Sequence, residues 1–321
     1  MSRKLLACLI VFISMISQNL HALDFNSGGL SYTTNGNTGE VIITGVTNTS
    51  VSSVTIPPTV TNKGTAYPVK WINMDAFNKC KALKTVTVED SEDPLIAISR
   101  TKSNASIEEV YMGRPVVDFF SNIKSIKKVT FSDNLTWIAN ESLWGCTGLT
   151  EITIPGSVSS ISKNAFTLCE NLSSVTFLPG DGELAISSDA FSSCPIYNIN
   201  LGRNVEAHYK FMDVSLDKLV VTKDVDEVSG VLFLYSKHIK ELIIEDSEIP
   251  LEMDYNSFGK NIGELYLGRN IPSYGNFVDM PTLKEVTIGG LVTELTSGIF
   301  TGDIGLEKVT FGESLQKNPR K

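Results

Sequence analysis

Hydrophobic and polar residues alternate in short runs along most of this chain, and the runs return at a regular interval. Typical runs are KTVTV at 84–88, TEITI at 150–154 and EKVTF at 307–311. Alternation of this kind predicts a β-strand with one buried face. The apolar residue at the centre of the run occurs eleven times, at Val86, Val110, Val129, Ile152, Val175, Ile199, Leu219, Leu242, Leu265, Val286 and Val309.

The spacing of these runs predicts the architecture. Neighbouring central residues lie 19 to 24 positions apart, about 22 on average, which is the period of leucine-rich repeats. A single repeat cannot bury its own apolar stripe, so successive repeats must stack into one continuous core. We therefore expect a mainly β leucine-rich-repeat solenoid of about 11 repeats over residues 71–321. Short helical or irregular segments should form its back.

A second phrase lies between the strands and predicts how the back is packed. It reads INMDAFNKC at 72–80, ISKNAFTLC at 161–169 and ISSDAFSSC at 186–194. From Ser215 to Ile288 the strands continue but the phrase is lost, so we expect a less regular back there. The phrase also predicts a packing column of buried free thiols, because free cysteine behaves as a small hydrophobe. The column would hold Cys80, Cys146, Cys169 and Cys194, with Cys146–Cys169 the first pair to consider for a bridge.

The first 70 residues do not carry the full repeat. Residues 1–22 have the form of a signal peptide, with a basic start, the apolar run Leu5–Ile16 and a cleavage position after Ala22. That run is too short for a comfortable transmembrane helix, and no second membrane segment follows it. Residues 23–70 contain short alternating runs separated by turn-forming residues, and we expect them to be an N-terminal β cap that covers the end of the solenoid.

Charge and motifs narrow the function. The net charge of −9 and the pI of about 5.0 argue against a nucleic-acid partner. The sequence has no HExxH, GxSxG, Walker or Rossmann motif and no CxxC pair, so we expect no enzyme activity, no cofactor and no metal site. The acidic runs EDSED at 89–93 and EDSE at 245–248 are the best cation candidates, but solvated strand ends explain them more simply. Carboxylate pairs for glycoside hydrolysis stay open as a third functional class.

The exposed face of the strands is more informative. Side chains at the middle of each V-x-I run point outward, and most of this column is threonine. Three consecutive strands instead carry Val220, Ile243 and Tyr266. An apolar strip with a charged rim is typical of a protein-binding patch. The expected ligand-binding residues are this strip, its rim and one isolated outward tyrosine, that is Val220, Ile243, Tyr266, Lys218, Glu241, Glu264 and Tyr111.

The repeat also resembles a known family. The form L-x-x-V-x-I-P-x-x-V-x-x-I-x-x-x-A-F-x-x-C is similar to the BspA-like leucine-rich repeat of bacterial surface and secreted proteins. The match is closest at Leu149, Ile152, Ile154, Pro155, Val158, Ile161, Ala165, Phe166 and Cys169. The resemblance covers nearly all of the chain after residue 22, although 215–290 matches only in its strands. It implies a curved β solenoid with a role in attachment, and extracellular matrix proteins are among the ligands it implies.

These observations predict an exported, cell-surface or secreted protein without catalytic activity. It would bind a host or community macromolecule, either a matrix protein or a glycan, through its strand face. The alternative is a structural module that displays itself or multimerises on the envelope without a soluble ligand.

Overall fold

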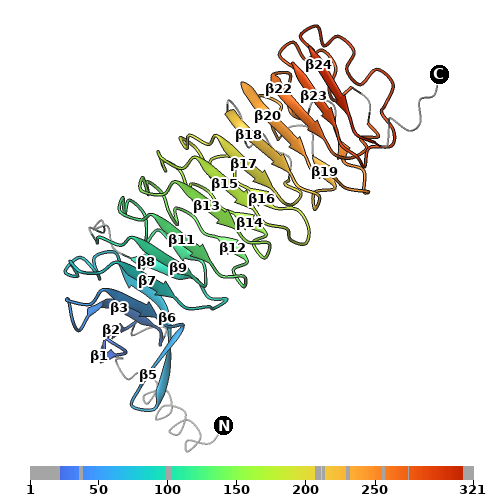
Figure 1. The fold of residues 1–321 in the computed structure, drawn as a ribbon. Coiled ribbons are helices and arrows are strands. Elements are labelled where there is room, and N and C mark those ends of the chain that lie inside the picture. The colour runs from blue at the N-terminus through green and yellow to red at the C-terminus, as the bar shows by residue number, and fades with distance from the viewer. Residues whose placement is uncertain are drawn as a thin grey trace, which may run out of the picture.

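The computed structural model describes residues 22–35, 39–98, 103, 105–206, 211, 214–228, 232–254, 257–273 and 275–313. Its strands stack along one long axis, from the N-terminal sheet to the last strand (Figure 1). The expected signal peptide lies outside the described residues except for Ala22. Within the described ranges, no helix is long and apolar enough to cross a membrane.

The front of the stack is a row of short parallel strands. All eleven expected strands form, and one further strand precedes them. They are β4 (Ser53–Ile56), β7 (Thr85–Val88), β9 (Glu109–Met112), β11 (Lys128–Phe131), β13 (Glu151–Ile154), β15 (Ser174–Phe177), β17 (Asn198–Leu201), β18 (Ser215–Val221), β20 (His238–Ile244), β22 (Ile262–Leu267), β23 (Glu285–Ile288) and β24 (Lys308–Phe311).

This row is not one sheet. Its hydrogen bonds join β4, β7, β9 and β11 into one sheet and β13 through β24 into an eight-stranded sheet. No ladder connects β11 to β13, although both strands are fully described. The solenoid therefore has a seam between Phe131 and Glu151, which nothing in the sequence predicted.

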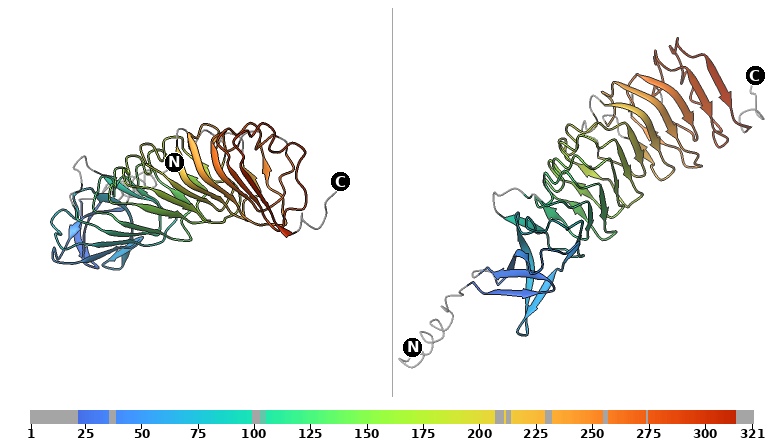
Figure 2. Two further views of the ribbon diagram at one scale, coloured as in Figure 1. Left: turned by 45° about the horizontal axis from the view of Figure 1, so that its top comes forward. Right: turned by 60° about the vertical axis from the view of Figure 1, so that its left-hand side comes forward.

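The back of the solenoid consists of turns and short strands. These strands are β8 (Leu95–Ile98), β10 (Val116–Val117), β12 (Trp137–Ile138), β14 (Ser160–Ile161), β16 (Ala185–Ile186), β19 (Glu227–Val228) and β21 (Glu252–Met253). In the described residues the back is thus irregular rather than helical. Figure 2 shows the same stack from two other sides.

The N-terminal end is a mixed sheet. Antiparallel β1 (Asp24–Ser27), β2 (Leu30–Thr34) and β3 (Val41–Val46) continue into parallel β6 (Thr65–Asn73), β8 and β10. A hairpin joins β5 (Thr59–Asn62) to β6 through Lys63 and Gly64, whose φ values of 49° and 83° suit the tight two-residue turn. Because β6 spans residue 70, the expected cap and the solenoid share one sheet.

Aromatic rings run through the core on the side away from the front sheet. Seven phenylalanines contact one another in order, with ring centroids 5.0 to 6.5 Å apart, at Phe166, Phe191, Phe211, Phe233, Phe258, Phe277 and Phe300. The expectation that the phrase is lost after Ser215 is therefore wrong for its aromatic position. The ring remains at Phe233, Phe258 and Phe277 while the alanine and cysteine around it change.

The four cysteines of the predicted packing column, Cys80, Cys146, Cys169 and Cys194, are free. Each of the last three donates its thiol to a backbone carbonyl of the preceding coil, with Sγ–O distances of 3.2, 3.2 and 3.1 Å for Cys146, Cys169 and Cys194. Burial raises the pKa of Cys146 to about 12, and only Cys194 is half-buried. The column thus serves packing and hydrogen bonding between coils.

Candidate ligand-binding surface

The front face has the alternation that the sequence predicts. In β13 the residues run exposed, buried, exposed, buried, and the other front strands follow the same order with few departures. Of the eleven central residues, nine are buried, Val129 is half-buried and the terminal Val309 is 36% exposed. The middle position of each strand therefore faces solvent, and threonine occupies it in most strands because a β-branched polar residue suits a wet strand face.

The expected apolar strip exists as a row of direct neighbours. Val220 of β18 pairs in register with Ile243 of β20, and Ile243 pairs with Tyr266 of β22. All three residues are half-buried. Asn200 and Thr287 bound the strip at its two ends, so the apolar surface is limited to three strands.

The charged rim is also in register. Lys218 pairs with Glu241, and Glu241 pairs with Glu264. The Lys218 Nζ lies 3.2 Å from Glu241 Oε2. The row continues to Glu285, which has its own ion pair with Lys308 at 3.0 Å. Two of the three adjacent glutamates are thus partly neutralised, and Glu264 between them keeps the rim acidic.

Tyr266 is held in place by its hydroxyl group. The hydroxyl donates to Asp246 Oδ2 at 2.8 Å. Burial and this hydrogen bond raise the pKa of Tyr266 to about 12. Tyr111 is held in the same way by Asp90 Oδ1 at 3.1 Å, but it lies on β9, far along the stack from the strip. The structure brings six of the seven expected residues together and leaves Tyr111 apart, and their role as ligand contacts stays a prediction.

The two acidic runs have a structural use. Asp90 and Asp246 each accept the hydroxyl of a tyrosine on the next strand. The glycine two residues after each tyrosine packs against the same turn. A Cβ on Gly113 would lie 2.2 Å from Asp90 Oδ1, and one on Gly268 would lie 2.4 Å from the Asp246 nitrogen. Only glycine lets the turns approach this closely. The sequence E-D-S-E followed by Y-x-G-R occurs in two similar blocks, the first at 89–114 and the second at 245–269.

Arg114, Arg203 and Arg269 each follow a glycine and are buried, which sequence reasoning missed. Arg269 donates to the carbonyl oxygens of Val225 at 2.7 Å and Thr222 at 2.8 Å, two coils earlier. Arg203 donates to four carbonyls, and Arg114 donates to Val69 and Pro57. Burial lowers the pKa of Arg114 to about 10. Each guanidinium replaces water for several turn carbonyls that would otherwise be unpaired.

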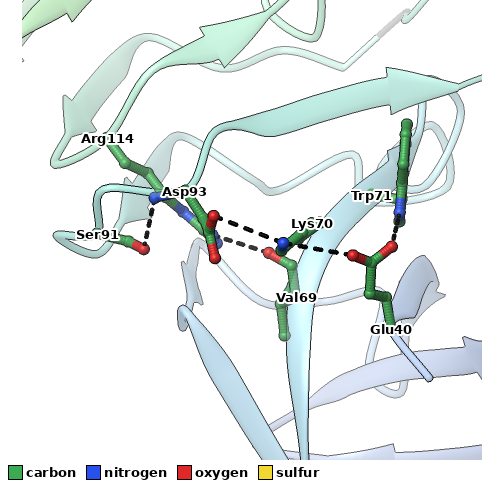
Figure 3. A network of polar contacts seen from close by, with 7 residues as sticks. All are labelled: Glu40, Val69, Lys70, Trp71, Ser91, Asp93 and Arg114. Carbon is green, nitrogen blue, oxygen red and sulfur yellow. Dashed lines mark hydrogen bonds and ion pairs between the residues drawn. The ribbon is translucent and has the colours of Figure 1, made fainter. Parts of the chain in front are cut away.

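Around Arg114 a surface network ties the N-terminal sheet to the first coils (Figure 3). Lys70 Nζ lies 3.3 Å from Glu40 Oε1 and 3.5 Å from Asp93 Oδ1. Trp71 Nε1 donates to the other oxygen of Glu40 at 2.9 Å. Glu40 raises the pKa of Lys70, with a smaller contribution from Asp93. The last carboxylate of the first acidic run therefore serves as an ion-pair partner.

No group of three or more His, Cys, Asp or Glu side chains that could hold a metal occurs among the described residues.

The comparison with protein families decides to which class of protein the chain belongs. Residues 117–208 and 207–320 match the BspA type Leucine rich repeat region, in six copies. The chain belongs to this family. It is a repeat scaffold, in a family that is not known for enzymes.

Several solved structures resemble this BspA-type protein. A leucine-rich repeat protein from Bacteroides capillosus is 24% identical, with 48% of this chain and 97% of that chain covered and a TM-score of 0.31. A leucine rich cell surface protein from Faecalibacterium prausnitzii is 19% identical over 92% and 97%, with a TM-score of 0.26. A leucine rich repeat protein from T. pallidum is 19% identical over 57% and 85%, with a TM-score of 0.37. None of the curated proteins matches the sequence.

Proposed function

We propose that this protein is exported to the cell surface or the medium and binds a protein ligand there, without catalysis, through the strip of Val220, Ile243 and Tyr266. The observation that carries the proposal is the contiguity of the strip on a front face that is otherwise mostly polar. Threonine at these positions would satisfy the strand equally well. Folding alone therefore does not require three apolar side chains in successive strands, and their presence supports a role in binding.

The rim indicates the chemistry of the ligand. Glu241, Glu264 and Glu285 lie side by side, and only the first and the last have lysine partners. A protein surface with an aliphatic or aromatic side chain for the strip and a lysine or arginine for Glu264 is complementary to both features. The apolar contact with the strip would supply most of the affinity, and the charged rim would mainly raise the association rate.

A binding experiment tests this function. The purified protein is screened by surface plasmon resonance against immobilised extracellular matrix proteins, with polysaccharides as a second panel. The test variant, called the Ser triple variant, carries Val220→Ser, Ile243→Ser and Tyr266→Ser. A second variant carries Tyr266→Phe in place of Tyr266→Ser, because phenylalanine retains the ring. The matched control carries Thr87→Ser and Thr176→Ser on the same face, at positions that are half-buried like the strip, and circular dichroism confirms folding of each.

The proposal expects a matrix protein that binds the wild type and the control equally and the Ser triple variant at least about tenfold more weakly, because hot-spot side chains carry most of the binding energy. Higher salt should slow the association. Unchanged binding by the Ser triple variant would remove the site. Binding of polysaccharides alone would replace the ligand class. A mass above the monomer by light scattering, without any ligand, would favour the self-assembling module instead.

A further inference from the structure

The seam between β11 and β13 leaves two strand edges without partners in the middle of the sheet. The alternation of hydrogen bonds shows which groups are affected. Lys128 N and Ser132 N donate to the carbonyls of Glu108 and Met112, so the even-numbered residues of β11 face β9. In a parallel ladder each residue directs its N–H and C=O to the same side. The N–H and C=O groups of Val129 and Phe131 therefore face the seam.

The opposite wall is equally unpaired. Ser174 N and Leu178 N donate to the carbonyls of Thr150 and Ile154, so the even-numbered residues of β13 face β15. Glu151 and Thr153 then direct their backbone groups toward β11. None of these groups has a backbone partner, although residues 105–206 are described without a gap. Unpaired edges of this kind are templates for another strand.

A cleft of about 440 Å³ opens at this place. Its apolar lining includes Val129, Phe131, Pro155 and Leu178, and Leu178 is 38% exposed. Val129 is the only central strand residue before the last strand that is not buried. The cleft therefore offers apolar surface as well as backbone donors and acceptors, which is the combination that binds an extended peptide.

Hydrogen bonds join the coils on the back of the solenoid at the seam, so the gap opens only toward the front. We call this gap the wedge. Asn122 N donates to the carbonyl of Trp144 at 2.6 Å, and Ser142 Oγ donates to the carbonyl of Val116 at 2.6 Å. At the front, Asp90 Oδ2 accepts hydrogen bonds from Ser132 Oγ at 3.0 Å and Asn134 Nδ2 at 2.9 Å. These bonds hold the turn after β11 against the N-terminal block and away from β13.

We propose that the seam is a second binding site, which takes an extended peptide segment of a partner protein by strand addition. The peptide backbone pairs with the free edges of β11 and β13, and its alternate apolar side chains enter the cleft. Parts of the two strands lie within 8 Å of each other at their Cα atoms, which is less than two strand spacings of about 4.8 Å each. Binding must therefore widen the wedge about its closed back.

The test uses a synthetic probe and a reversible clamp. The probe is an acetylated and amidated heptapeptide of alternating threonine and valine, and its control carries N-methyl groups at alternate residues along one edge. The clamp is Thr130→Cys with Thr153→Cys, joined by a short bifunctional thiosulfonate that dithiothreitol removes. Both threonines are exposed. The matched control clamp is Thr287→Cys with Thr310→Cys, which are register neighbours in the closed ladder of β23 and β24.

All proteins in this test carry Cys8→Ser and Cys194→Ser, because the remaining thiols of Cys80, Cys146 and Cys169 are buried. A hydroxyl at position 194 can keep the hydrogen bond to the carbonyl of Phe166. Calorimetry should show that the probe binds and that N-methylation weakens it at least about tenfold, since several hydrogen bonds are lost. The seam clamp should abolish binding, reductant should restore it, and the control clamp should change nothing. Hydrogen exchange should show new protection at Val129, Phe131, Glu151 and Thr153.

Three results would overturn the proposal. The first is the absence of binding up to about 1 mM probe. The second is equal binding of the N-methylated probe, because strand addition requires the amide donors. The third is binding that persists with the seam clamped, which would place the probe at another edge such as that of β24. None of these results bears on the strip on β18, β20 and β22, whose variants are separate.

Discussion

Replacing Phe233 with alanine should unfold the C-terminal part of the solenoid before the rest. Phe233 is fully buried, and its ring lies 5.4 Å from that of Phe211 and 6.1 Å from that of Phe258. Truncating a buried phenylalanine to alanine costs about 3–5 kcal/mol. The Phe233→Leu variant keeps most of the apolar volume and loses mainly the two ring contacts, so it should cost about 1–3 kcal/mol.

The assay exploits where the tryptophans lie. All three, Trp71, Trp137 and Trp144, belong to the N-terminal half, so their fluorescence reports that half while circular dichroism reports the whole stack. A repeat stack is stabilised by contacts between neighbouring coils. In urea, Phe233→Ala should therefore shift the circular dichroism midpoint downward much more than the fluorescence midpoint.

Phe166→Ala is the matched control, because Phe166 is also fully buried and stacks on Phe191 at 5.0 Å. It should lower both midpoints, since its coil lies closer to the tryptophans. A loss of less than about 1 kcal/mol for Phe233→Ala would contradict the aromatic column as a source of stability. Equal shifts of the two signals would show that the solenoid unfolds as one unit.

Three further predictions concern hydrogen bonds between coils. Arg203→Met should lower the free energy of unfolding in urea by about 3 kcal/mol or more, because it leaves buried carbonyls unpaired. Arg203→Lys should not restore the stability. A loss below about 1 kcal/mol would contradict this prediction. Tyr266 has a raised pKa, so its contribution to stability should be complete below pH 10 and decrease between pH 10 and about 12. The stability of the Tyr266→Phe variant should not change in this way over that pH range. Asp246→Asn should lower the pKa of Tyr266 in an ultraviolet titration, and an unchanged titration would argue against the hydrogen bond. Ser132→Gly combined with Asn134→Leu should close the seam and slow hydrogen exchange in β13, and unchanged exchange would show that Asp90 does not hold it open.

The fold could be predicted because its signal is local and repeated. The alternation around Ile152 sets a strand and its inward face, and the period of about 22 residues sets the stack. Register then places Val220, Ile243 and Tyr266 side by side, as the structure has them. What the pattern could predict was therefore the position of the candidate residues, because position follows from period alone.

The features that were missed depend on contacts between coils. Arg203 bonds to Gly156, which lies 47 residues earlier, and no local pattern marks an arginine as buried. The repeated Gly-Arg pairs at 113–114, 202–203 and 268–269 were the available signal. Phe211 and Phe233 were missed because the alanine and cysteine that usually flank the ring are replaced there. The seam depends on whether a hydrogen-bond ladder forms, which the composition of β11 does not show.

A difference between the two similar blocks explains why the strand ladder is interrupted after the first block and continuous after the second. In the first block, Asp90 binds Tyr111 and also Ser132 and Asn134 of the coil after it. In the second block the equivalents of Ser132 and Asn134 are Gly289 and Leu291, which offer no side-chain donor.

Asp246 therefore contacts only Tyr266 among the equivalent groups, and a Cβ on Gly289 would lie 2.4 Å from its Oδ1. The glycine lets the turn after β23 approach Asp246 closely, and the ladder continues from β22 through β23 to β24 beside the apolar strip. A rigid ladder suits a flat patch of side chains, whereas a turn held back by Asp90 leaves backbone edges free. The difference at these two side-chain positions thus accounts for two kinds of surface on similar blocks: a continuous face at the second block and a wedge at the first.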